Sequence, residues 1–357
     1  MSNRAEPNSV KRALAIAEQV VMTQGSIFIR ELLRNKKREG SKVAIGTTKE
    51  EILDNLVKAI RDNVVTAADL DDWVEEIEGW GRQHVYMHRV GQRIVASPAL
   101  ESPAQLLSAL RDSKMAATWG KRTSLDFPDE LAISRIDFDG DVLQVGWQQR
   151  YDRWQREKSL DPPRQTIEGD VYEFRAYRQE LLRSVMRFVL FVKSRRAALF
   201  IQLPLADPRH QAARDLAKAT LGKLISWDEL KPLSISKAIK AIDEIDLRAP
   251  TSGNALAGRM QAQNTRFGAG GATVEFDADP AIVAWKNIAA VRQVRNALQL
   301  NSFTGHSGKF IVELRSGTGL NRSVIVSLDG RQKRLYLWSQ MSATEVWLVL
   351  DEVVKHG

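Results

Sequence analysis

The sequence predicts an α+β protein in which a helical module comes first and antiparallel sheet domains follow. Two observations support this fold class. Within residues 9–80, apolar side chains recur at helical spacing behind recognisable helix starts. From residue 84 onward, apolar and polar side chains alternate, and turn signals separate the alternating runs. With 357 residues, the chain is long enough for two or three domains, each with its own core.

Four helices are expected in the first part, residues 1–82. Thr48 and Glu51 have the spacing of a capping box, in which a hydroxyl and a carboxylate bond the free amides of a helix start. Thr66 opens a further helix with an apolar inner face. Its outer face is acidic, with Asp71, Asp72, Glu75 and Glu76.

A central α+β domain is expected over residues 83–247. It begins with a strand at 84–90, and the turn Asp139-Gly140-Asp141 between alternating runs predicts a hairpin. Two further extended runs meet at the basic turn 193–196. Residues 248–271 are rich in small and polar residues, which predicts a flexible linker. The last part, 272–357, predicts a helix followed by a βββα unit, and we expect this sheet to serve dimerisation.

Composition narrows the function classes. Lys and Arg outnumber Asp and Glu by 52 to 44, and this excess favours a polyanionic partner. The chain has no cysteine, which excludes disulfides, thiolate metal sites and cysteine nucleophiles. No apolar run is long enough for a signal peptide or a membrane span, so we expect no membrane partner. A cytoplasmic, nucleoid-associated protein is expected in a prokaryote, and a nuclear one in a eukaryote.

Three groups of residues could in principle carry chemistry. His84 and His88 have an i, i+4 spacing, but they lie in an expected strand and lack a third zinc ligand. The acids at 137, 139 and 141 fit a hairpin tip better than a calcium loop. A metal-dependent nuclease remains an alternative, and its nearest candidates are Asp170, Glu173 and Lys193. We therefore expect no catalytic residue, metal or cofactor.

Basic residues gather between the second and third expected helices. They could meet successive phosphates, and the amides at the Thr48 helix start offer a further anion site. A solvated polar face is the alternative interpretation. The turn at Arg195 and Arg196 could extend the track. The first set consists of Arg30, Arg34, Lys36, Lys37, Arg38, Lys42 and Lys49.

Two resemblances point the same way. The segment from Ser26 to Ile60, with an apolar helix ending in basic residues and then Gly46-Thr-Thr-Lys49, resembles a SAP-type DNA-binding motif, although its connecting loop is longer. Over roughly residues 27–245, the helical module, the strands at 84–90 and 142–151, and the run 188–204 resemble the centromere protein N family. That resemblance implies a pyrin-like helical module and a basic groove that contact nucleosomal DNA, and a C-terminal sheet that pairs with a partner.

The sequence thus predicts a non-enzymatic DNA-binding protein. It is expected to contact the phosphate backbone of duplex DNA with weak sequence preference, and to form a homo- or heterodimer through its C-terminal domain. An adaptor that recruits a basic protein through the acidic helix 69–78 remains an alternative.

Overall fold

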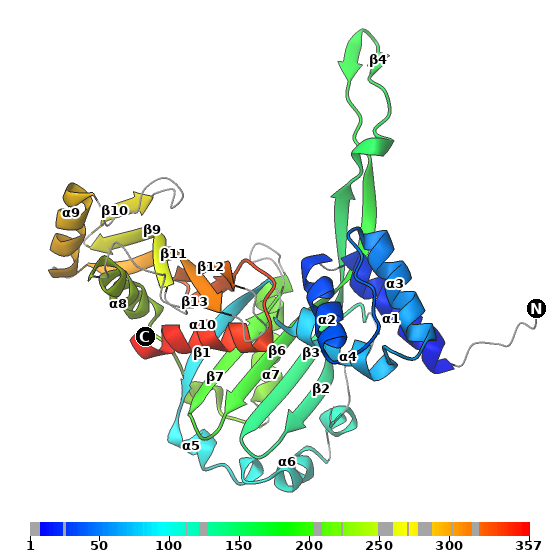
Figure 1. Cartoon of the computed structure of the whole chain (residues 1–357). Helices are drawn as coiled ribbons and strands as arrows, with labels where there is room; N and C mark the ends of the chain where they lie inside the picture. Colours follow the sequence, from blue (N-terminus) through cyan, green and yellow to red (C-terminus); the bar gives the residue numbers. More distant parts are fainter. Residues whose placement is uncertain are drawn as a thin grey trace, which may run out of the picture.

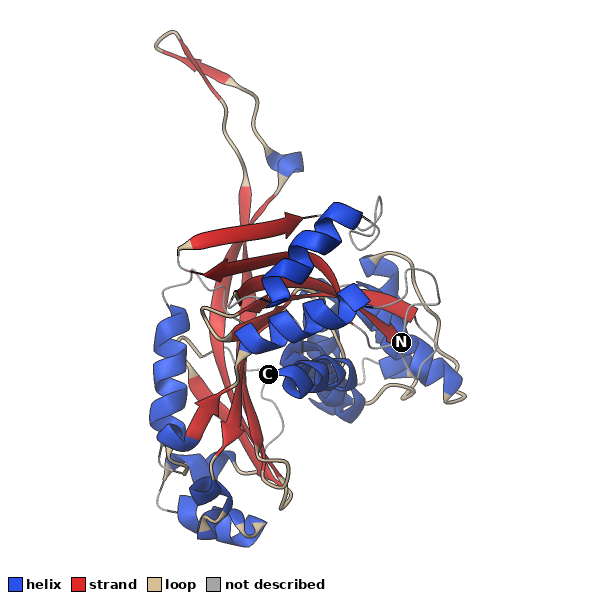
Figure 2. Ribbon diagram, turned by 90° about the vertical axis from the view of Figure 1, so that its left-hand side faces the viewer, coloured by secondary structure: helices blue, strands red, loops and turns tan. Residues whose placement is uncertain are grey.

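Helices form in the N-terminal part where the sequence predicts them, and the chain then enters one large antiparallel sheet (Figures 1 and 2). The structure is a computed structural model. It describes residues 8–23, 26–80, 82–111, 113–120, 128–202, 209–222, 224–248, 260–269, 271–277, 288–300, 303–315 and 321–357. The α+β prediction is confirmed.

Ten α-helices lie in the described residues. They are α1 (Asn8–Thr23), α2 (Ser26–Arg38), α3 (Lys49–Arg61), α4 (Ala67–Trp80), α5 (Gln92–Val95), α6 (Pro103–Leu110), α7 (Arg209–Leu221), α8 (Ile235–Arg248), α9 (Ala289–Leu300) and α10 (Ala343–His356). The capping box that the sequence predicts at Thr48 is formed before α3, and Ser342 forms another before α10. Among the described residues, no helix is both long enough and apolar enough to cross a membrane.

Thirteen strands lie in the described residues. They are β1 (Gln83–Val90), β2 (Ala132–Phe138), β3 (Val142–Arg156), β4 (Gln165–Ile167), β5 (Asp170–Tyr172), β6 (Tyr177–Phe191), β7 (Arg196–Ile201), β8 (Leu230–Pro232), β9 (Met260–Ala269), β10 (Ala272–Asp277), β11 (Thr304–Arg315), β12 (Asn321–Asp329) and β13 (Arg334–Leu337). The hairpin between β2 and β3 turns at Gly140, whose φ of 100° suits glycine.

One sheet joins the residues expected in the central and C-terminal domains. Its order is β10-β9-β11-β12-β13-β1-β7-β6-β3-β2, and β8 also pairs with β1. Strand β1 lies between β13 and β7 and is antiparallel to both. Of the segment expected as a linker, residues 249–259 lie outside the described residues, whereas 260–269 form β9 and pair with β10 and β11. The small and polar residues of this segment do not show the apolar pattern typical of a strand. Strand β10 beyond it is the edge of the sheet, and most of its side chains are exposed.

The two faces of the sheet carry separate cores. On one face, Val85 and Met87 of β1 pack in a cluster with α8, α10 and Trp80 of α4. On the other face, Tyr86 packs in a cluster with α5, α6 and α7. Strand alternation produces this division, since successive side chains point to opposite faces. The module α1–α4 has a third core of its own, which includes Ile16, Leu33 and Leu56.

Aromatic and charged contacts hold the helical module against the sheet. Trp80 at the end of α4 meets Phe200 of β7 and Trp347 of α10 edge to face, with ring centroids 5.3 and 5.8 Å apart. The guanidinium of Arg187 lies 4.4 Å from the Trp80 ring centroid. The module therefore sits on the face of the sheet that α8 and α10 cover.

Strands β3 and β6 continue beyond the body of the sheet. Their ladder reaches from Val142 paired with Phe191 to Arg156 paired with Tyr177. The neighbouring strand β2 stops at the rung of Gln148, and β7 stops at the rung of Met186. The outer ladder and the hairpin β4–β5 consequently stand out from the body as a long arm, residues 152–182 (Figures 1 and 2).

Candidate nucleic-acid interface

The cations of α2 and the following loop are largely held by groups of the same module. Lys36 Nζ lies 2.7 Å from Asp69 Oδ1 of α4 and 3.5 Å from Glu39 Oε2. The hydrogen bond to Asp69 is the main cause that raises the pKa of Lys36. Arg34 and Arg38 both pair with Glu31, at 3.5 and 3.4 Å.

The remaining members of this set divide into bound and exposed groups. Arg30 donates through Nη2 to the Thr47 carbonyl. Lys49 is half-buried and also has an interaction partner. Lys37 and Lys42 are exposed, and neither forms an ion pair with any residue that the structure describes. Two lysines thus remain open at a place where the sequence suggests seven cations.

At the start of α3, where an anion site is expected, a carboxylate of the same chain already accepts hydrogen bonds. The Glu51 carboxylate accepts hydrogen bonds from the Thr47 amide and hydroxyl, both at 2.6 Å, and from the Thr48 amide at 3.4 Å. The Thr47 hydroxyl is the main cause that lowers the pKa of Glu51. A carboxylate of the chain therefore already accepts from two amides at this helix start, which weakens it as a phosphate site.

The acidic face of α4 is likewise engaged within the molecule. Arg12 of α1 donates to both oxygens of Asp71, at 2.9 and 3.0 Å, and Asp71 is buried. Glu75 pairs with Arg135 of β2 and lies 3.9 Å from Arg187 of β6. Asp72 is exposed and also has an interaction partner, and the side chain of Glu76 lies outside those described. This face ties α4 to α1 and to the sheet, which weakens it as a surface for a basic partner.

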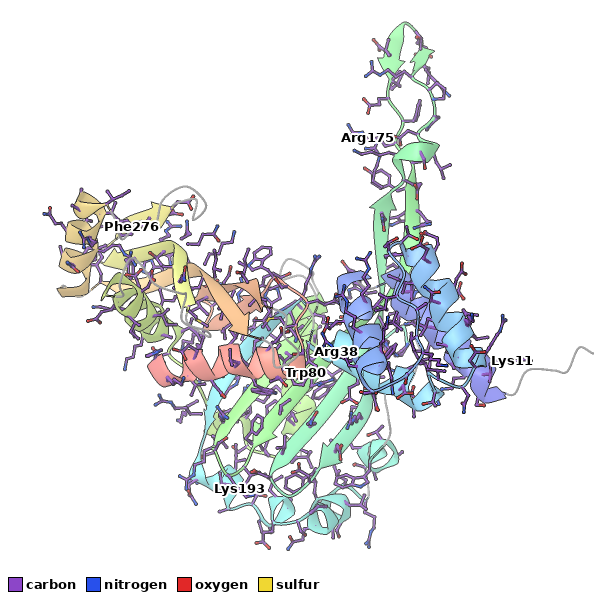
Figure 3. The ribbon with its side chains drawn as sticks, viewed as in Figure 1. Lys11, Arg38, Trp80, Arg175, Lys193 and Phe276 are labelled. Atoms are coloured by element: carbon purple, nitrogen blue, oxygen red, sulfur yellow. The ribbon has the colours of Figure 1, made fainter. Side chains whose placement is uncertain are left out.

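Arg195 and Arg196 do not extend a track from α2. They lie at the turn between β6 and β7, whose Lys193 lies at the lower end of the body, away from Arg38 near the middle of the view (Figure 3). Arg196 pairs with Asp351 of α10, and its guanidinium lies 5.3 Å from the Phe191 ring centroid. Arg195 is exposed.

The nuclease candidates are also separated. Asp170 and Glu173 lie on the arm, as does Arg175 in Figure 3, whereas Lys193 lies at the far end of β6. Asp139 accepts hydrogen bonds from the amides of Asp141 and Val142 at 2.8 and 2.7 Å, as an acid of a hairpin tip does. Within the described residues, no three His, Asp or Glu side chains gather where they could hold a metal ion.

A groove lies on the α7 face of the sheet, across β10, β9, β11, β12, β13 and β1. Its volume is about 620 Å³, within the range typical of ligand sites. Basic, acidic, amide, hydroxyl and aromatic groups line it. They include His84, Gln263, Asn264, Asp277, Lys309, Ser327, Asp329, Arg334, Tyr336 and Trp338.

Three rings form a row in this groove. The Tyr336 ring centroid lies 4.5 Å from that of His84 and 4.6 Å from that of Trp338. Tyr336 and Trp338 share a face because they stand two residues apart on a strand. Trp338 donates from Nε1 to Ser327 Oγ at 2.7 Å, so its ring is held in place although the residue is 50% exposed.

The polar groups of the groove are incompletely satisfied. Arg334 donates to His84 Nδ1 at 2.8 Å and to Asp329 at 3.3 Å, but its buried Nε has no partner among the residues that the structure describes. The buried Gln263 Oε1 atom, also on the lining, has no partner among them either. Lys309 is half-buried and makes no ion pair with a described residue. A buried donor and acceptor without partners are uncommon in native proteins, and both would be satisfied by a polar ligand.

Burial keeps His84 neutral. It is the main cause that lowers the pKa of His84 to about 3, and the nearby Arg334 and His210 lower it further. Neutral His84 can accept the hydrogen bond from Arg334 at Nδ1. The positive charge in this part of the groove therefore rests on Arg334 and Lys309, next to exposed aromatic surface.

Sequence reasoning did not find this groove. Its residues come from six strands between positions 84 and 338, and the tryptophans suggested core positions. The available signal was the alternation Arg334, Tyr336, Trp338 in one strand, which places a cation and two rings on one face. A scan against protein-family models finds no match for this chain, and a search of the curated proteins finds no relative.

Proposed function

We propose that this chain is a nucleic-acid-binding protein whose principal contact surface is the groove on the α7 face of the sheet. One observation carries the proposal: Tyr336 and Trp338 share an open sheet face with Lys309 and Arg334 within one groove. Aromatic rings beside cations form a common surface for single-stranded nucleic acid, because every base has a face that can stack.

The groove offers each interaction that a nucleotide strand requires. The fixed, half-exposed Trp338 ring can stack on a base, and Tyr336 extends the platform. The amide groups of Gln263 and Asn264 can bond base edges, and Lys309 and Arg334 can contact phosphates. Such a strand would also give the Arg334 Nε an acceptor and the Gln263 Oε1 a donor.

The helical module supplies a weaker candidate surface, through Lys37 and Lys42. It lies against the α8 and α10 face of the sheet, whereas the groove lies on the α7 face. One strand or duplex would therefore have to pass around the sheet to contact both surfaces. The groove favours a single strand over the duplex that the α2–α3 segment suggests.

Fluorescence anisotropy with labelled single-stranded DNA, single-stranded RNA and duplex probes tests the proposal. Trp338→Ala should weaken single-strand binding roughly tenfold or more, because stacking on one ring contributes about 1–3 kcal/mol. Leu348→Ala is the matched control, since Leu348 is an exposed apolar residue of α10, on the opposite face.

Lys309→Ala should lower the slope of log affinity against log salt by about 0.7 for a single strand. Exposed Lys58 of α3 gives the control Lys58→Ala. The proposal is wrong if the wild-type chain binds no probe at low salt. Equal affinities for Trp338→Ala and Leu348→Ala would also contradict it.

A further inference from the structure

The arm concentrates exposed apolar surface. Fourteen large hydrophobic side chains are exposed in the described residues, and seven of them lie in the arm's 31 residues. Several of these side chains are largely exposed: Leu160 is 69% exposed and Val171 is 67% exposed. The seven are Trp154, Leu160, Ile167, Val171, Tyr172, Phe174 and Tyr177. A patch of this kind on a soluble chain is typical of a protein interface.

The arm also lacks the packing that normally stabilises a hairpin. Among the described residues, no further strand lies beside β3 or β6 beyond the rungs of Gln148 and Met186, and the outer strands β4 and β5 pair only with each other. A two-stranded hairpin alone in water is marginally stable, because no third strand or helix covers it. A protein surface packed against the arm would cover both its free strand edges and its apolar side chains.

The charges of the arm argue against a nucleic-acid occupant. Residues 152–182 contain six basic and seven acidic residues, so the arm lacks the positive excess that binds phosphates. Three of the arm's cations are paired within the arm: Arg156 pairs with Asp161, and Arg175 and Arg164 lie 3.3 and 3.9 Å from Glu173. Both signs are interspersed, so a second arm would meet opposite charges without net repulsion.

We propose that the arm packs against the arm of a second copy of this chain and forms a two-fold symmetric dimer. A two-fold interface places the same patch on both subunits, which requires a self-complementary surface. The arm meets this requirement through its balanced charge and its apolar residues. It also has enough residues, since a standard interface uses about 20–30 on each side. This inference is independent of the groove.

Sedimentation velocity on the full chain over a concentration series tests the proposal. The wild-type chain should sediment as a dimer. The variant carrying Leu160→Glu and Val171→Glu should raise the dimer dissociation constant by about 100-fold or more, because charges replace apolar contacts at the interface. The control carries Leu107→Glu and Leu216→Glu, exposed leucines of α6 and α7, and should stay dimeric.

A shortened arm provides a second variant that keeps the body intact. The Glu157 amide donates to the Ala176 carbonyl at 3.0 Å, so an Asn-Gly turn can replace residues 158–175 at that rung. This variant should be monomeric and should keep wild-type affinity for single-stranded probes at the groove, measured as a single-site titration.

The absence of cysteine permits a direct view of the dimer. A spin label on Thr166→Cys at the arm tip should show dipolar coupling between two copies, and dilution with unlabelled chain should remove that coupling. The same label on Lys11→Cys, at the N-terminal end of α1 (Figure 3), is the control position. A wild-type chain that is monomeric throughout the series overturns the proposal. So does a dimer that persists in both arm variants, or one that forms only when nucleic acid is added.

Discussion

The α2–α3 segment and the sheet groove both carry cations, but they differ in what holds those cations. On α2, carboxylates of the same module pair with Arg34, Lys36 and Arg38. In the groove, Lys309 has no such partner among the described residues. Arg334 pairs with Asp329 at 3.3 Å, but its buried Nε has no acceptor in the described part of the chain. A basic run in the sequence therefore shows where charged residues are, but only the fold shows which of those charges a ligand can reach.

The largest effect is expected where the helical module meets the sheet. Glu75 pairs with Arg135 and lies near Arg187. The side chain of Arg135 is 21% exposed and that of Arg187 is 10% exposed. Glu75→Ala should lower the free energy of unfolding by about 2–3 kcal/mol, because removing one partner leaves largely buried guanidinium groups less well compensated. Urea denaturation measures this change. The control Glu50→Ala, at an exposed position of α3, should stay within about 0.5 kcal/mol of wild type. Equal stability of the two variants would show that Glu75 does not hold the module.

A smaller effect is expected at the bidentate pair of Arg12 and Asp71. Asp71→Ala should lower the free energy of unfolding by about 1–2 kcal/mol, since its carboxylate is only 8% exposed and accepts two charged hydrogen bonds. A double-mutant cycle with Arg12→Ala isolates the pair, and we expect a coupling of about 1 kcal/mol. A coupling near zero would mean that the bond does not stabilise α1 against α4.

Local signals were readable from the sequence, and distant pairings were not. The capping boxes at Thr48 and Ser342 involve residues three positions apart, so their spacing alone predicts them. The pairing of Lys36 with Asp69 joins residues on different helices, and no local pattern announces it. For the same reason the basic set and the acidic face of α4 both appeared open to partners, although cations and carboxylates of the same chain partly neutralise each of them.

Strand order was equally hidden. The hairpin of β2 and β3 follows from its Asp-Gly turn, but the position of β1 between β7 and β13 depends on contacts between residues more than a hundred positions apart. The groove exists only because of that order, since His84 of β1 reaches Tyr336 through it. The arm arises because β3 and β6 are longer than the strands beside them. This difference in length depends on the pairing of distant segments, so no single segment predicts it.

The groove should show its own pH signature, of roughly 1 kcal/mol. The unfolded chain protonates His84 near pH 6.5, whereas burial in the folded chain lowers the pKa of this histidine to about 3. The unfolded state thus binds more protons between these values, so stability should fall by roughly 1 kcal/mol as pH drops from 7 to 5.5. Urea titrations at several pH values should show a shallower fall for His84→Gln than for wild type. The comparison of slopes separates this effect from any general loss of packing. Identical slopes would contradict the assignment.

The smallest effect is expected at the two open lysines of the helical module. Reversing both, with Lys37→Glu and Lys42→Glu, should change the free energy of unfolding by less than about 0.5 kcal/mol, because both are exposed and without ion pairs among the described residues. If the groove alone contacts the strand, the salt slope of binding should also stay unchanged. A duplex-bound phosphate at each lysine would instead lower the slope by about 1.8 in the double variant. That outcome would return the interface to the α2–α3 segment and leave the groove without its proposed role, so this variant discriminates between the two surfaces even though the expected change is nil.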